Sequence, residues 1–96
     1  MVSKDKRHLF PSYPRVYLTQ YRLDSNMSGN EVAECIGISL NYYYGLENGS
    51  RGHNFGIRLL KGICRCFNVD ANTVLEKETR YQKERDVFMT HKKAKR

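Results

Sequence analysis

Residues 41–44 place one asparagine before three consecutive tyrosines, and a glycine follows at position 45. The carboxamide of Asn41 carries a donor and an acceptor side by side, so it can pair with a group that offers both. Phenol hydroxyls donate hydrogen bonds to anionic oxygens, and a glycine leaves room for a close approach. This set of side chains suits recognition of a polar or anionic partner better than catalysis.

The residues that commonly perform catalysis or bind metals lack a suitable arrangement in this sequence. Ser28 and Ser39 precede helical patterns, and a role as helix caps accounts for both of them without a nucleophile pair. Cys64 and Cys66 are two positions apart on an expected helix, so they point in different directions and a metal site there is disfavoured. The sequence therefore predicts no enzyme activity, no metal and no cofactor, and no small-molecule ligand is evident.

The composition narrows the class of protein. The chain has 96 residues, of which 40% are hydrophobic, and this suits one small globular domain. No apolar run approaches the roughly 20 residues that span a bilayer, and no secretory signal is visible. Three cysteines without C-x-x-C spacing fit reduced thiols. We therefore expect a cytoplasmic protein that has no membrane partner.

The net charge of +7 is concentrated toward the ends of the chain. Residues 76–96 hold eight basic and four acidic side chains, whereas residues 15–75 hold six basic and five acidic ones. Basic ends indicate a polyanionic partner, although such charge runs are often only solvated.

Helix start and stop signals predict five helices and no strand. Ser28 and Glu31 form a capping box, and Gly37 can close the short helix that follows. Ser39 can cap a third helix and Asp70 a fifth one. The expected helices are about 14–25, a short one between Ser28 and Gly37, a third from Ser39 through Glu47, and a fourth that follows Asn54 and ends at Asn68, with the fifth beginning after Asp70. The fold class is therefore all-α, with five helices.

The distribution of apolar residues divides this chain into three parts. Residues 1–13 are expected to form a flexible basic arm, 14–79 the domain, and 80–96 a charged extension that is partly helical and then disordered. The apolar stripe from Ile57 to Phe67 is expected to lie in the core. The sparse apolar residues of the C-terminal part are expected to dock on the domain or on a second copy; they are Val74, Tyr81, Val87 and Phe88.

The second and third expected helices have the spacing of two short helices that cross steeply. Such a pair needs a small residue where the helices touch and, between them, a turn residue that accepts a positive φ. Ala33 and Gly37 fill these two positions. The apolar positions around them are Val32, Ile36, Ile38, Tyr43 and Leu46.

From Arg22 to Leu75 the sequence resembles the Cro and lambda-repressor type of helix-turn-helix DNA-binding domain, also called XRE-like. Members often read roughly L-R-x-x-x-G-L-T-Q-x-x-L-A-x-x-L-G-V-S, followed by I-x-x-x-E-N-G-x-R. The segment 67–75 is similar to the family's ending, L-G-V-S-x-x-x-L-L. The matching residues are Tyr21, Arg22, Met27, Ser28, Gly29, Val32, Ala33, Ile36, Gly37, Ile38, Ser39, Leu46, Glu47, Asn48, Gly49 and Arg51.

The resemblance implies a transcriptional regulator, and specifically a repressor, that reads double-stranded DNA as a homodimer. The third helix would enter the major groove, and Arg22 would form a structural ion pair with Glu47. Asn41 can pair with the N6 and N7 edge of adenine, and Leu40 can meet a thymine methyl group. The expected DNA-binding residues are Ser28, Gly29, Ser39, Leu40, Asn41, Tyr42, Tyr44, Gly45, Asn48, Arg51, His53 and Asn54.

The roles of these residues follow from their places on the helices. Tyr42 and Tyr44 can hydrogen-bond phosphate or pack on sugar, and Gly45 lets the third helix approach the DNA. The amides that begin the second and fourth helices, those of Ser28, Gly29, Asn54, Phe55 and Gly56, can seat phosphates.

Departures from the family pattern leave other functions open. Gly29 stands where the family commonly has glutamine, and no Lys or Arg occurs between residues 23 and 50. The Tyr42 and Tyr44 face could instead bind a protein, as in an antitoxin or an antirepressor. A third reading is non-specific binding of nucleic acid by the basic ends.

Overall fold

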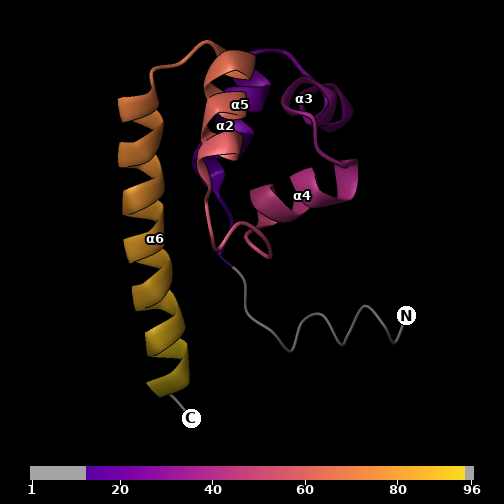
Figure 1. The fold of residues 1–96 in the computed structure, drawn as a ribbon. Coiled ribbons are helices and arrows are strands. Elements are labelled where there is room, and N and C mark those ends of the chain that lie inside the picture. Colours follow the sequence, from indigo (N-terminus) through magenta and orange to yellow (C-terminus); the bar gives the residue numbers. More distant parts are fainter. Residues whose placement is uncertain (1–12, 95–96) are drawn as a thin grey trace, which may run out of the picture.

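The structure is a computed structural model that describes the backbone of residues 13–94 and the side chains of residues 13–90. It contains α2 (Val16–Asp24), α3 (Gly29–Ile36), α4 (Leu40–Asn48), α5 (Ile57–Phe67) and α6 (Ala71–Ala94). The part of the chain that is described contains no strand, which confirms the expected five-helix, all-α fold. In Figure 1, α3 and α4 lie on one side of α5, and α6 runs along the other side.

Local hydrogen bonds explain where α3 begins and ends. The Ser28 hydroxyl accepts from the Glu31 amide at 3.1 Å, while the Glu31 carboxylate accepts from the Ser28 amide at 2.8 Å. Gly37 ends α3 in the left-handed conformation at φ 91°. The chain can therefore turn at once into α4, where the Ser39 hydroxyl accepts from the Tyr42 amide at 3.0 Å.

Residues with positive φ or short polar side chains separate the other helices. Gly49 ends α4 at φ 90°, and Asn68 ends α5 at φ 55°. Asn26, between α2 and α3, has φ 59°. The carboxylate of Asp70 accepts from the Asn72 amide at 3.0 Å, so this residue caps the start of α6.

The core lies where all five helices meet. Ala33 is 2% exposed at the crossing of α3 and α4, where the close approach of the two helices requires a small side chain. Gly62 allows α3 to approach α5, since a Cβ there would lie 2.8 Å from Cγ2 of Ile36. The buried cluster consists of Leu18, Val32, Ala33, Tyr43, Leu46, Ile63 and Val74.

The apolar stripe of α5 is less buried than its spacing predicted. Ile63 is fully buried, but Ile57 is 70% exposed and does not belong to the core. Ile57 lies in the first turn of α5, where it lines a shallow hollow at the surface together with Leu60 and Cys64. The assignment of Ile57 to the core was therefore wrong.

α6 is the longest helix, and its C-terminal half extends beyond the other helices (Figure 1). Val74 and Tyr81 are buried against the domain, and the ring of Phe88 lies 5.1 Å from that of Tyr13. Val87 remains 69% exposed. The division into arm, domain and extension stays a prediction; residues 1–12 of the arm and 95–96 lie outside the described residues. None of the described helices is long and apolar enough to cross a membrane.

Arg15 joins the start of α2 to three other parts of the fold, a role that no sequence pattern predicts. The side chain is 1% exposed, and its Nε and Nη2 each donate to a carboxylate oxygen of Glu78 on α6 at 2.9 Å. The guanidinium also donates to the carbonyls of Leu46, Arg51 and Gly52, each at 2.9 Å. Although burial opposes its charge, the bonds to Glu78 raise the pKa of Arg15.

Candidate nucleic-acid interface

Tyr43 faces the core and fixes the rotation of α4 about its axis. Its side chain is fully buried, and its hydroxyl donates to the carboxylate of Glu47 one turn later. The Nε of Arg22 on α2 donates to the same carboxylate oxygen at 2.6 Å. This pair is the ion pair that the family resemblance implied, so Glu47 belongs to the scaffold and not to the surface that meets a ligand.

The pKa values of these groups follow from their surroundings. Burial and the bond to Glu47 raise the pKa of Tyr43, so its hydroxyl keeps the proton that it donates. Burial also opposes ionisation of Glu47, but the bonds from Arg22 and Tyr43 outweigh it and lower the pKa of this carboxyl. At neutral pH the Arg22 guanidinium and the Glu47 carboxylate are therefore both charged.

With Tyr43 inward, the opposite face of α4 is exposed. Asn41 and Leu40 occupy its first turn, where Leu40 is 37% exposed. Tyr44 is 46% exposed in the second turn, and Asn48 is exposed at the end of the helix. Ser39 is also exposed, but its hydroxyl is engaged as the helix cap. Leu40, Asn41, Tyr44 and Asn48 form what we call the α4 outer face.

Tyr44 lies across the start of α3. A Cβ on Gly29 would come within 2.7 Å of both the hydroxyl oxygen and a ring carbon of Tyr44. Gly29 is therefore buried beneath the tyrosine ring, and only a glycine leaves space for it. The tyrosine hydroxyl consequently lies at the N-terminus of α3, next to the position where glutamine is common in the resembling family.

Gly45 is covered by Arg51, contrary to the expectation that it faces a ligand directly. A Cβ on this glycine would collide with Cγ of Arg51 and lie 3.3 Å from the hydroxyl oxygen of Ser50. Gly45 is buried for this reason, while Arg51 itself is exposed. The glycine makes room for an arginine at the C-terminal flank of the α4 outer face, and its assignment as a directly exposed residue was wrong.

The matching family model is described as helix-turn-helix and covers residues 18–74, which is more than half of the chain. The chain belongs to this helix-turn-helix family. The family is of the Cro and lambda-repressor, XRE-like type, and its members bind DNA, which places this chain among DNA-binding proteins of transcription regulation. Members are typically not enzymes. No curated protein and no solved structure matched the chain.

The start of α3 differs from the phosphate seat that was expected in a helix-turn-helix protein of this type. The Ser28 amide donates to the Glu31 carboxylate, so it is not available to a phosphate. The carboxylate also places a negative charge beside this helix end. The assignment of the Ser28 amide as a phosphate seat was therefore wrong, because the capping box uses it.

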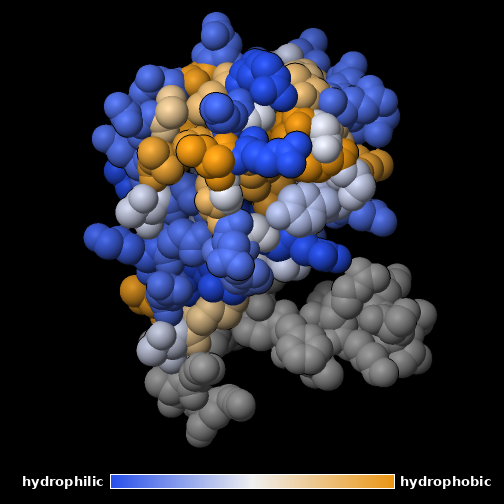
Figure 2. Space-filling model, viewed as in Figure 1, coloured by the Kyte–Doolittle hydropathy of each residue, from blue (hydrophilic) through white to orange (hydrophobic). Residues whose placement is uncertain are grey.

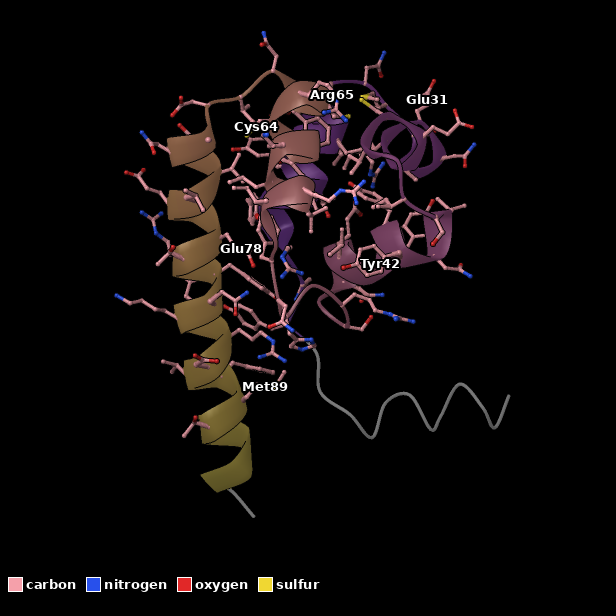
Figure 3. The ribbon with its side chains drawn as sticks, in the orientation of Figure 1. Glu31, Tyr42, Cys64, Arg65, Glu78 and Met89 are labelled. Carbon is pink, nitrogen blue, oxygen red and sulfur yellow. The ribbon has the colours of Figure 1, made fainter. Side chains whose placement is uncertain are left out.

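Tyr42 is only partly exposed and packs against the helix-turn-helix core. It extends from α4 into a groove that is also lined by Ile38, Leu59 and Arg58 (Figure 3). Packing in this groove accounts for the buried part of the ring. A contact of its hydroxyl with DNA stays a prediction.

The loop between α4 and α5 carries the remaining expected DNA-binding residues. His53 and Asn54 are exposed, and Nη2 of Arg85 on α6 lies 2.7 Å from Nε2 of His53. Gly56 precedes α5 at the N-cap position and offers no side chain to cap the first amides of that helix. Asn48 holds the start of the loop, because its Oδ1 accepts from the Ser50 amide at 2.9 Å.

Two further residues that hold this loop in place were missed. Arg15 holds the carbonyls of Arg51 and Gly52, so it positions the loop that carries Arg51. Arg85 holds His53 from α6. No short-range pattern marks either residue, since their partners lie more than 30 positions away in the sequence.

Proposed function

We propose that this protein is a sequence-specific regulator of transcription, acting as a repressor, that reads the major groove of duplex DNA with the α4 outer face. The observation that carries the proposal is the rotation of α4: Asn41 is exposed while Tyr43 is fully buried. A helix held in this way presents its first turn to a groove, as the second helix of a helix-turn-helix does. A domain bound there excludes other proteins from the same site.

Base readout rests on the first turn of α4 in this proposal. The carboxamide of Asn41 pairs with the N6 and N7 edge of an adenine, and the exposed side chain of Leu40 packs on a thymine methyl group. Asn48 lies further along the face, and its Oδ1 is already engaged by the Ser50 amide, which leaves its NH₂ group as a donor. The preferred half-site therefore contains A·T pairs.

Phosphate contacts flank this readout on both sides. The Tyr44 hydroxyl lies at the start of α3 and donates to the phosphate backbone of one strand. It takes the role of the glutamine that the family commonly has at the position of Gly29. Arg51 supplies a charged donor at the other flank, together with the uncapped amides at the start of α5. Gly29 and Gly45 thus leave the space that Tyr44 and Arg51 occupy, and from there these two donors reach the DNA.

Dimerisation would place two copies of α4 on successive half-sites of a two-fold operator. Exposed apolar groups on α5 support it, because Ile57 is 70% exposed and lines a hollow with Leu60, Cys64 and Ala71. Figure 2 shows hydrophobic side chains exposed among hydrophilic ones in the part of the view where α5 lies. An exposed apolar hollow of this kind is typical of a surface through which two copies of a protein associate.

Binding-site selection from a random duplex library, followed by fluorescence anisotropy on the selected site, tests the proposal. Asn41→Ala should weaken binding to the selected site by about 10-fold to 100-fold and relax the preference at one base pair, since it removes one bidentate contact. Asn72→Ala, at an exposed position of α6, is the matched control and should bind as the wild type does. Equal affinity for all sequences would disprove specific regulation.

The second candidate function is a protein-interaction module on the same fold, as in an antitoxin or an antirepressor. It is favoured by the absence of Lys and Arg from α4 and by the exposed Leu40 and Tyr44. Replacing Asn41 and Tyr44 together by alanine separates the two functions. Loss of DNA binding supports the regulator, whereas intact DNA binding with loss of a co-purifying protein supports the module.

A further inference from the structure

The C-terminal ends of α3 and α5 meet at two cysteines that the DNA-binding proposal does not use. Cys35 is the last but one residue of α3, and Cys66 is the last but one residue of α5. Nη2 of Arg65 donates to the carbonyl oxygen of Cys35 at 3.4 Å, so the two helix ends are in contact. Figure 3 shows sulfur, in yellow, beside Arg65 where α5 passes α3.

The side chains of the two cysteines face each other. The thiol of Cys66 lies close enough to that of Cys35 for the two groups to interact, and both residues are half-buried. One turn before Cys66, Gly62 of α5 packs closely against Ile36 of α3. This contact fixes the distance between the two cysteines. Disulfide formation requires two cysteines at close range, and the packing of these two helices brings the two thiols together.

We propose that Cys35 and Cys66 are a modification site that forms a reversible disulfide in the presence of a peroxide. The sulfur of one cysteine attacks hydrogen peroxide and becomes a sulfenic acid, with release of one water. The sulfur of the other cysteine then gives up its proton and attacks the sulfenic sulfur, which forms the disulfide and releases a second water. The two thiols lose two electrons and two protons in total, and the peroxide is reduced to water.

The environment of Cys66 slows its reaction at neutral pH. Burial, followed by the contact with Cys35, raises the pKa of Cys66 to about 12, so this thiol keeps its proton at neutral pH. A protonated thiol is a poor nucleophile, so Cys66 reacts slowly at neutral pH in either step. Exchange with a small thiol such as glutathione restores both cysteines.

The disulfide would act as a staple across the DNA-binding unit. The segment between Cys35 and Cys66 contains α4 and the loop that carries Arg51, so the bond closes this segment into a ring. Ring closure restricts the unfolded chain and therefore stabilises the fold. Because the thiols are already in contact, α4 keeps its place, and affinity for DNA should be retained after oxidation.

Cys64 provides an internal control, because it lies elsewhere. It packs against the core and is close to Tyr21, whose pKa is raised by burial and, to a smaller extent, by this thiol. Two positions on one helix point apart, so Cys64 cannot replace Cys66 beside Cys35.

Mass spectrometry of the full-length folded protein after treatment with hydrogen peroxide tests the proposal. The wild type and Cys64→Ser should each lose the mass of two hydrogen atoms, and peptide mapping should find a Cys35–Cys66 link. Cys35→Ser and Cys66→Ser should lose no hydrogen in this way. Links between separate chains only, or an unaltered mass of the folded wild type under these conditions, would overturn the proposal.

Thermal unfolding gives a second readout, which does not depend on how the serine variants fold. The oxidised wild type should melt at a temperature higher by on the order of 10 °C than the reduced protein. Dithiothreitol should reverse this increase. An oxidised protein that contains the link but melts at the same temperature as the reduced one would contradict the role as a staple.

Discussion

The molecule contains two arginine–glutamate pairs that differ in how deeply they are enclosed. The side chains of Arg15 and Glu78 are 1% and 6% exposed, whereas those of Arg22 and Glu47 are 19% and 11% exposed. Arg15 makes five hydrogen bonds that join the start of α2 to α6, to α4 and to the loop after it. The enclosed pair holds distant parts of the chain together, and the more open pair sets the orientation of one helix.

The two pairs act on the same end of α4, and this explains how the helix is held. Arg15 binds the carbonyl of Leu46, where the negative end of the helix dipole favours a cation, and Arg22 binds Glu47 beside it. Both contacts lie in the last turn. The first turn, which carries Asn41, is left exposed to meet a ligand.

Breaking the enclosed pair should have the largest effect on stability. Arg15→Met leaves the Glu78 carboxylate buried without its cation, and three carbonyls lose their donor. We expect the free energy of unfolding to fall by about 3–5 kcal/mol, as for other buried pairs that lose one member. Urea denaturation measures this change.

Glu76→Gln is the matched control for the enclosed pair, because Glu76 lies exposed on the same helix. It should change the free energy of unfolding by no more than about 0.5 kcal/mol. A loss below about 1 kcal/mol for Arg15→Met would contradict the assigned importance of the pair.

Breaking the more open pair should cost less. Glu47→Gln removes the charge that Arg22 and Tyr43 bond to, while it keeps the shape of the side chain. We expect a decrease of about 1–3 kcal/mol, which is smaller than for Arg15 because water reaches part of this pair. The same denaturation experiment ranks the two variants, and the reverse order would refute the comparison.

The lowered pKa of Glu47 adds a pH dependence to this variant. The carboxyl titrates near 4.5 when it is unperturbed and lower in the folded protein, so the stability that it contributes is complete above that pH. This contribution disappears as the pH falls through the folded pKa. The difference in stability between the wild type and Glu47→Gln should therefore narrow below pH 4.5. A difference that stays constant in acid would contradict the lowered pKa.

Gly45→Ala should have the smallest effect on the fold and still alter the interface. Alanine favours the helix by about 1 kcal/mol, but its Cβ forces Arg51 out of its present position. The two effects oppose each other, so the net change in stability should stay within about 1 kcal/mol. Affinity for the selected duplex should fall by about 5-fold to 10-fold, as for the loss of one charged phosphate contact. Unchanged affinity would show that the seat of Arg51 has no part in binding.

Features that depend on neighbouring residues could be predicted from the sequence. The capping box at Ser28 and the turn at Gly37 follow from residue types within a few positions, and the structure contains both. The inward position of Tyr43 follows from helical periodicity together with the family resemblance. These local features set the position and the rotation of α4, so the fold and most of the α4 outer face could be predicted.

Features that depend on the path of a loop could not be predicted. Helical periodicity puts Gly45 on the outer face, but the loop returns and lays Arg51 over it. Arg15 has the sequence signature of a surface residue, and only its partner 63 positions away explains its burial. The periodicity of α5 also cannot show that Ile57, in its first turn, stays exposed.

The central claim is that the exposed first turn of α4 meets DNA between the donors of Tyr44 and Arg51. Amide chemical shifts, followed by NMR while the selected duplex is added to the full-length protein, test it most directly. The largest changes should occur at Leu40 and Asn41, with further changes at Gly29 and Arg51. Changes confined to α6, with the amides of α4 unaffected, would contradict it.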